Sequence, residues 1–126
     1  MSKYPFGIDL GTTNSALGIY TGGTVETVKI NGRTTIPSVV WYKSDGTVVV
    51  GTEAYDRKGQ SDVIYSTKRD MGTDTVYHLV LEDGTKKDVT PIEVASEVLK
   101  AIINNSDKLY GTVDEAAITV PAYFND

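Results

Sequence analysis

The sequence contains no cysteine and a single histidine, His78. Without cysteine the chain can form neither a disulfide framework nor a thiolate zinc site, and a solitary histidine indicates neither a catalytic triad nor a metal cluster. These absences remove thiol chemistry and histidine-based metal sites from consideration. We assign His78 no function.

The chain also lacks a basic excess and an N-terminal apolar run. Its 12 lysines and arginines against 17 aspartates and glutamates leave a net charge of -5, so neither nucleic acid nor a membrane surface is expected as a partner. Residues 1–5, MSKYP, lack the apolar segment of a secretory signal, and we expect a cytoplasmic protein. With 126 residues, 40% of them hydrophobic, the chain is long enough for one modest domain with a core.

Two common phosphate-binding motifs are missing as well. Neither the pattern GxxxxGK[ST] of a P-loop nor the pattern GxGxxG of a Rossmann fold occurs. The N-terminal region instead contains the segment GIDLGTTNS at residues 7–15. Apolar residues alternate with small or polar ones at 6–10 and at 16–20, which is the period of a β-strand. We therefore predict a β-hairpin.

The turn of this hairpin has the composition of a phosphate grip. Gly11 can take backbone angles closed to other residues, and the four polar residues after it offer N–H and side-chain groups in one bend. Successive N–H groups around a concavity bind phosphate oxygens, and Asp9 can hold a hydrated divalent cation. These features indicate nucleotide phosphate binding, although an ordinary polar hairpin turn explains the spacing alone equally well.

Turn signals and apolar periodicity predict the other short elements. Pairs such as Asn-Gly and Asp-Gly separate β-rich runs, which we expect as strands at 25–30, 39–42, 48–50, 77–81 and 86–89. Short helices are predicted at 52–58 and at 61–70, the second ending at Gly72.

A longer helix is predicted to begin after Thr90. Thr90 suits the N-cap, Pro91 the first helical position, and Glu93 completes a capping box. The face expected to pack against a sheet carries Ile92, Ala95, Leu99, Ile102 and Ile103. Gly111 ends the pattern, and a buried strand is predicted at 116–120. This order of elements indicates an α/β layer structure.

Several blocks of the chain resemble one family, in the family's own order. Besides residues 7–15, they are RTTIPSVV at 33–40, KRDMG at 68–72, TPIEVASEVLK at 90–100 and AITVPAYFND at 117–126. The segment GIDLGTTNS resembles the first phosphate loop of the DnaK-type, seventy-kilodalton heat-shock chaperones, and the other blocks are similar to later motifs. The resemblance covers nearly the whole chain, and only 72–88 matches loosely.

The resemblance implies a fold and a division of the chain. The fold is α/β, part of one lobe of the actin-like, ribonuclease-H-like ATPase fold, with a mixed sheet, flanking helices and a smaller α+β sublobe. Residues 1–35 and 113–126 would form the core subdomain that carries the first phosphate loop, and 36–112 a smaller peripheral subdomain. Because the ATPase domain of that family is much longer, we expect this chain to be a fragment of it.

The resemblance also implies roles for residues of the turn. Asp9 would take part in catalysis by holding Mg²⁺, mostly through water. Gly11, Thr12, Thr13 and Asn14 would contact the β- and γ-phosphates of ATP or ADP.

Residues outside the turn receive roles in the same way. Lys68 matches the catalytic lysine that approaches the γ-phosphate and orients the attacking water. Pro121 matches the proline that relays the nucleotide state towards the peptide-binding domain, although a proline that merely ends a strand is an equally good interpretation. Arg69 fits a salt bridge within its lobe or a partner contact equally well. Trp41 and Tyr42 are expected to pack rather than to stack on a base.

The implied function is that of a molecular chaperone ATPase, in which ATP hydrolysis controls peptide binding by a separate domain. Its partners would be unfolded peptide clients, a J-domain co-chaperone and a nucleotide exchange factor. The remaining parts of the nucleotide site would lie outside this chain. We therefore expect the chain alone to bind nucleotide weakly and to hydrolyse it negligibly.

Two other classes of protein stay open. A sugar or acetate kinase, or a ribonuclease-H-like nuclease with Asp9 as metal ligand, would share the superfold, but the blocks at 68–72 and 117–126 argue against both. A non-enzymatic interaction module would keep the fold without hydrolysis. Nucleotide-selective binding would separate the ATPase and kinase interpretations from the module.

Overall fold

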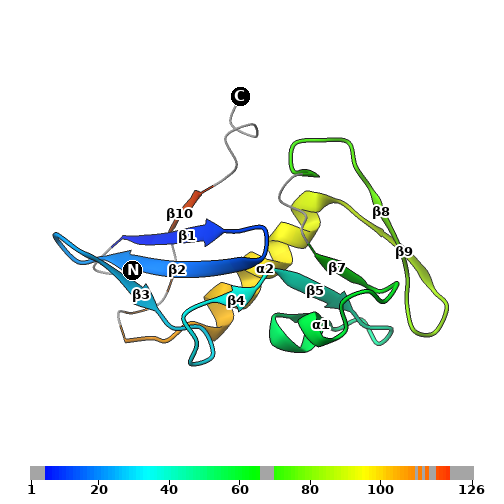
Figure 1. The fold of residues 1–126 in the computed structure, drawn as a ribbon, viewed down its shortest axis with the longest axis horizontal. Coiled ribbons are helices and arrows are strands. Elements are labelled where there is room, and N and C mark those ends of the chain that lie inside the picture. The colour runs from blue at the N-terminus through cyan, green and yellow to red at the C-terminus, as the bar shows by residue number, and fades with distance from the viewer. Residues whose placement is uncertain (1–4, 66–69, 110, 112, 114–115, 120–126) are drawn as a thin grey trace.

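The computed structural model describes residues 5–65, 70–109, 111, 113 and 116–119, which form three β-sheets and two α-helices (Figure 1). The first sheet contains β10 (Ala116–Thr119), β1 (Phe6–Leu10), β2 (Asn14–Tyr20) and β3 (Val25–Val28) in this order, and β4 (Ile36–Pro37) pairs with β2. The second sheet contains β6 (Val48–Val50), β5 (Val39–Tyr42) and β7 (Val63–Tyr65), and the third contains β8 (Tyr77–Val80) and β9 (Lys86–Val89). The helices are α1 (Thr52–Asp56) and α2 (Pro91–Asn105).

The predicted N-terminal hairpin is confirmed. β1 pairs antiparallel with β2 and parallel with β10, so the first sheet is mixed. In the two arms Phe6, Ile8, Leu17 and Ile19 are at most 3% exposed and Leu10 is 9% exposed, because the strand period of two places these five side chains on the core face. Every other predicted strand also occurs, within two residues of its predicted bounds.

The capping box at the start of α2 is confirmed. The Glu93 backbone N–H donates to Thr90 Oγ1 over 3.2 Å, and the Thr90 backbone N–H donates to the Glu93 carboxylate over 3.1 Å. These reciprocal bonds satisfy two donors at a helix end that would otherwise lack partners. They define where the helix begins.

The buried face of α2 differs in part from the predicted one. The residues packed into the core are Val94, Val98 and Ile102, spaced four apart, whereas Ile92 is 57% exposed. Of the predicted face, Ile102 is buried, and Ala95, Leu99 and Ile103 are partly buried and pack against the core, so only Ile92 lies outside it. The apolar stripe of the sequence is broader than the contact, and tertiary packing selects which side of the stripe faces inward.

The end of α2 also differs, because the helix stops at Asn105 and not near Gly111. Ser106 has an extended backbone and forms a β-bridge with Ile30. On either side of this bridge, the N–H of Asn31 donates to the Asn105 carbonyl over 3.0 Å, and the N–H of Asp107 donates to the Lys29 carbonyl over 2.7 Å. Pairing with that segment, which is remote in sequence, ends the helix.

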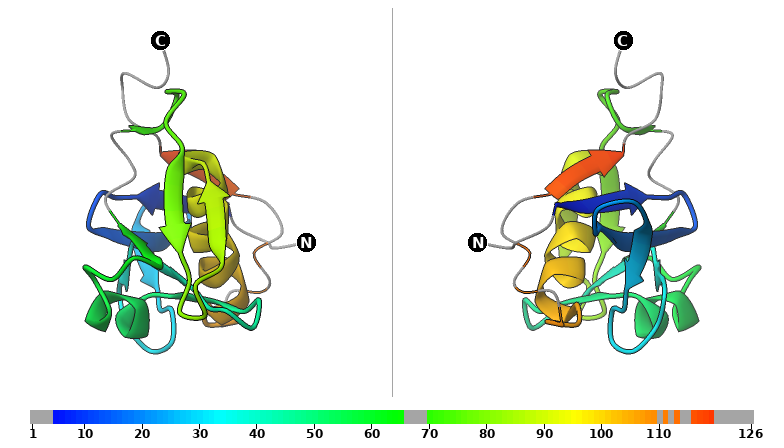
Figure 2. Two further views of the ribbon diagram at one scale, coloured as in Figure 1. Left: turned by 90° about the vertical axis from the view of Figure 1, so that its right-hand side faces the viewer. Right: turned by 90° about the vertical axis from the view of Figure 1, so that its left-hand side faces the viewer.

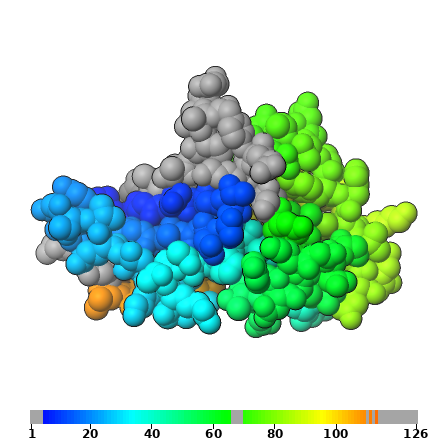
Figure 3. Space-filling view, in the orientation of Figure 1, coloured from blue at the N-terminus to red at the C-terminus, as the bar shows by residue number. Residues whose placement is uncertain are grey.

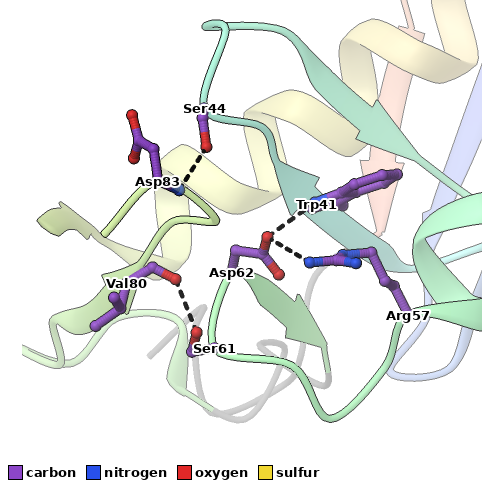
Figure 4. A network of polar contacts seen from close by, with 7 residues as sticks. All are labelled: Trp41, Ser44, Arg57, Ser61, Asp62, Val80 and Asp83. Atoms are coloured by element: carbon purple, nitrogen blue, oxygen red, sulfur yellow. Dashed lines mark hydrogen bonds and ion pairs between the residues drawn. The ribbon is translucent and has the colours of Figure 1, made fainter. Parts of the chain in front are cut away.

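The helix predicted at 61–70 is wrong, whereas the one predicted at 52–58 is confirmed as α1. Residues 63–65 form β7, which pairs antiparallel with β5, and residues 66–69 lie outside the described part of the chain. β-Branched and aromatic side chains favour a strand when a partner strand is available. The Asp62 carboxylate helps to place β7, because it accepts hydrogen bonds from Trp41 over 3.1 Å and from Arg57 over 2.9 Å (Figure 4).

One main core joins the elements. Buried residues of the first sheet, of β5, of the β8–β9 hairpin and of α2 belong to a single apolar cluster. Figure 2 shows why: α2 lies between the first sheet, which faces the viewer in one view, and the β8–β9 hairpin, which faces the viewer in the other. Neither helix of the described residues is long and apolar enough to cross a membrane. The division into subdomains at 1–35, 36–112 and 113–126 stays a prediction.

Candidate functional site

The polar turn of the hairpin joins β1 to β2 through Gly11, Thr12 and Thr13. Thr12, Thr13 and the next residue, Asn14, are exposed, and so is Asp9, which alternates with the buried residues of β1. The structure therefore brings the predicted carboxylate and the predicted phosphate-binding residues together at one end of the hairpin. In Figure 3 this blue surface borders the cyan surface of the segment that contains β4.

Gly11 is needed at this turn for a reason different from the predicted one. Its φ lies outside the left-handed region that favours glycine. A Cβ atom at this position would instead lie 2.0 Å from the Asn14 carbonyl oxygen, which is far inside van der Waals contact. The backbone at Gly11 approaches the Asn14 carbonyl so closely that only a residue without a side chain fits.

The turn presents hydrogen-bond donors that find no partner among the residues the structure describes. Within the described part of the chain, the backbone N–H groups of Thr12 and Thr13 donate to no acceptor, and the side chains of Thr12, Thr13 and Asn14 make no hydrogen bond. Neighbouring free N–H groups and hydroxyls around a tight bend can bind an anion such as a phosphate group. The arrangement is therefore chemically suited to the predicted ligand.

A neighbouring serine pair holds this turn, and the sequence prediction missed it. Ser38 follows β4, and its hydroxyl donates to the Gly11 carbonyl over 3.0 Å. Its backbone N–H donates to the Thr13 carbonyl over 2.9 Å, and Ser15 Oγ lies 2.9 Å from Ser38 Oγ. One signal was present in the sequence: Ser15 shares the buried face of β2 with Leu17, and a buried hydroxyl requires a partner.

The donor set around Asp9 fits a hydrated ion. Among the described residues, no group of three or more histidine, cysteine, aspartate or glutamate side chains could hold a metal. An exposed carboxylate such as that of Asp9 suits Mg²⁺, which keeps several of its waters and is commonly bound by one or two carboxylates together with phosphate oxygens. An exposed carboxylate of this kind can hold a hydrated divalent cation mainly through water.

Three other predicted residues lie outside the described residues. These are Lys68, Arg69 and Pro121, and their roles stay predictions. The packing expected of Trp41 and Tyr42 is confirmed. Tyr42 is buried in the main core, and burial next to acidic residues of α2 raises the pKa of its hydroxyl.

Trp41 is half-buried against a smaller cluster of apolar residues between α1 and the second sheet. The Arg57 guanidinium lies over the Trp41 ring, 4.6 Å from its centroid, and this contact leaves one face of the ring covered by protein. The indole therefore packs against protein groups, as predicted.

Comparisons with known proteins agree with this geometry. The family model described as "Hsp70 protein" matches residues 5–126. "Chaperone protein DnaK" of Metamycoplasma hominis is 36% identical over 98% of this chain and 20% of its own length. "Chaperone protein HscA homolog" of Tolumonas auensis is 38% identical over 98% of this chain and 23% of its own length. "Chaperone protein DnaK" of Mycoplasmopsis agalactiae is 39% identical over 95% of this chain and 20% of its own length.

The chain thus spans about a fifth of the length of these curated relatives. The match of the family model begins before β1 and includes the glycine turn, the serine pair and α2. The similarity is therefore spread over the whole chain and is not confined to one short motif. The chain belongs to the Hsp70 family.

Proposed function

We propose that this chain supplies part of the nucleotide site of a chaperone ATPase and that its β1–β2 turn binds the phosphates of ATP. The observation that carries the proposal is the turn itself. Within the described residues, the N–H groups and hydroxyls of Thr12 and Thr13 are free, and Gly11 permits a closure that any side chain would block. Family membership favours this function over the kinase and nuclease alternatives.

Each residue of the site has a chemical task in this proposal. The N–H and hydroxyl groups of the turn, with Asn14, bind and orient the β- and γ-phosphates. Asp9 orients the water shell of Mg²⁺, and the bound ion supplies positive charge that offsets the charge of the phosphate oxygens. Lys68 adds a compact positive charge at the γ-phosphate and orients the attacking water.

The complete chaperone would use this site to control a separate peptide-binding domain. Pro121 would relay the nucleotide state to that domain. The partners would be unfolded peptide clients, a J-domain co-chaperone and a nucleotide exchange factor, and the names of the relatives, DnaK and HscA chaperones, support this class of partner. Phosphoryl transfer needs charge stabilisation from several directions, so the isolated chain is expected to hydrolyse ATP negligibly.

Calorimetric titration of the complete cellular polypeptide with ATP, with and without Mg²⁺, tests the proposal. We expect selective, Mg²⁺-dependent binding of ATP. Asp9→Asn should abolish most of the gain in affinity due to Mg²⁺, about tenfold or more, because the ion loses the carboxylate that orders its water shell. Asp56→Asn is the matched control: it removes an exposed aspartate at the end of α1 and should change nothing.

Other results would contradict the proposal. Equal binding of ATP and of an unrelated anion would favour the interaction module, because that alternative requires no nucleotide selectivity. Turnover of ATP by the isolated chain at a rate that Asp9→Asn abolishes would show that the site needs no residues from outside this chain.

A further inference from the structure

Ser38 contacts the phosphate-binding turn at two points. Its hydroxyl donates to the Gly11 carbonyl and its backbone N–H donates to the Thr13 carbonyl, over 3.0 and 2.9 Å. Ser38 lies directly between β4, which pairs with β2 of the first sheet, and β5 of the second. A residue from outside the hairpin therefore fixes the backbone of the hairpin turn from both ends.

The directions of the hydroxyl protons follow from the contacts. A carbonyl oxygen can only accept, so the single proton of the Ser38 hydroxyl goes to Gly11. The Ser15 hydroxyl, 2.9 Å from Ser38 Oγ, must then be the donor in the contact between the two serines. Ser15 is 1% exposed, so water does not compete for its proton. The two hydrogen bonds therefore run in one direction, from the Ser15 hydroxyl to the Ser38 hydroxyl and from there to the Gly11 carbonyl.

These two hydrogen bonds determine the direction in which the Thr12 N–H points. In a trans peptide the carbonyl oxygen and the next N–H lie in one plane and point in opposite directions across the C–N bond. Because the Gly11 carbonyl is held towards Ser38, the N–H of Thr12 is held away from Ser38, on the open side of the turn. The same rule applies to the Thr13 carbonyl and the N–H that follows it.

We propose that Ser38 is a positioning residue for phosphate recognition: it aims the Thr12 N–H at the phosphate, and Ser15 supports it. This inference rests on the proposed ATP site and deepens it. Ser38 itself does not touch the nucleotide. Its contribution appears only for ligands that place a phosphate in the turn, because an adenosine without phosphates makes no use of that N–H.

The experiment measures affinities of the complete polypeptide for adenosine, Mg-ADP and Mg-ATP by calorimetry. Ser38→Ala should weaken Mg-ATP binding about fivefold, the effect of one lost neutral hydrogen bond, and leave adenosine binding unchanged. Ser38→Thr keeps the hydroxyl and should bind Mg-ATP within about twofold of the natural protein. Ser15→Ala leaves the bond to Gly11 in place and should cost less than Ser38→Ala.

A matched control removes an equivalent bond elsewhere. The Ser61 hydroxyl donates to the Val80 carbonyl over 2.8 Å, outside the turn, so Ser61→Ala tests whether losing any such bond weakens ATP binding (Figure 4). We expect Ser61→Ala to bind Mg-ATP normally. If Ser38→Ala fails to fold, as judged by thermal unfolding without nucleotide, Ser38→Cys is compared with Ser61→Ala in its place, because a thiol keeps the shape of the side chain but is a weak hydrogen-bond donor.

Two results overturn the inference while leaving the proposed function intact. One is unchanged Mg-ATP binding by Ser38→Ala, and the other is an equal loss for adenosine and Mg-ATP, which would mean that Ser38 only supports the fold. A natural protein that binds no Mg-ATP would instead overturn the proposed function, and this inference with it.

Discussion

At the scale of single residues, Gly11 shows that space rather than backbone angle can require a glycine. A Cβ at this position would lie 2.0 Å from a backbone oxygen that cannot move alone, so Gly11→Ala should open the turn, lower stability by about 1–3 kcal/mol and weaken ATP binding about tenfold or more. Gly84 offers a contrast, since it has a φ of 88° and open space around its Cβ position. Gly84→Ala should cost about 1–2 kcal/mol by strain and leave ATP affinity unchanged. Thermal unfolding measures the stability of both variants, and titration measures their ATP affinity. Equal ATP affinities for the two variants would contradict the requirement for glycine at the turn.

At the scale of elements, the Asp62 carboxylate ties β7 to α1 and β5. It is 1% exposed and accepts from both Trp41 and Arg57, which also stack on one another (Figure 4). Asp62→Ala would leave the Trp41 N–H and a partly buried guanidinium without this acceptor, and we expect a loss of about 2–3 kcal/mol in the free energy of unfolding. Asp88→Ala, at an exposed pair with His78, is the control and should cost less than about 1 kcal/mol. Urea unfolding compares the two, and similar losses would show that the Asp62 contacts contribute little.

At the scale of the whole molecule, the fold is confirmed as α/β of the actin-like ATPase type that the Hsp70 family shares. β5 joins its two clusters of apolar residues, because Val40 and Tyr42 face the main core and Val39 and Trp41 face the smaller one. Ile102→Ala removes a fully buried side chain of α2 from the main core and should cost about 2–5 kcal/mol. In the Ile102→Ala variant, the urea midpoint measured by the fluorescence of the only tryptophan, Trp41, should fall together with the midpoint measured by far-UV circular dichroism. We expect this because β5 connects the two clusters and makes unfolding cooperative. If the fluorescence midpoint of the variant equals that of the natural protein, the two clusters unfold separately.

Local patterns predicted much of the fold and of the site. The β1–β2 hairpin and the start of α2 follow from interactions between residues close in sequence, namely strand alternation and the Thr90–Glu93 capping box. The polar turn with Asp9 was found in the same way. The helix predicted at 61–70 failed because the choice between helix and strand depended on β5, which lies about twenty residues earlier in the chain.

The sequence by itself thus determined the strands of the hairpin, the composition of the turn and the cap of α2, because each depends on neighbours a few residues apart. Only the tertiary structure decided that Ser38 reaches the turn, that β7 is a strand, and that Val94 and Val98 rather than Ile92 lie on the buried face of α2. It also decided why Gly11 must be a glycine, because the Asn14 oxygen blocks the Cβ position only once the hairpin closes. These features arise from contacts that exist only when the chain is folded, and no local propensity encodes them.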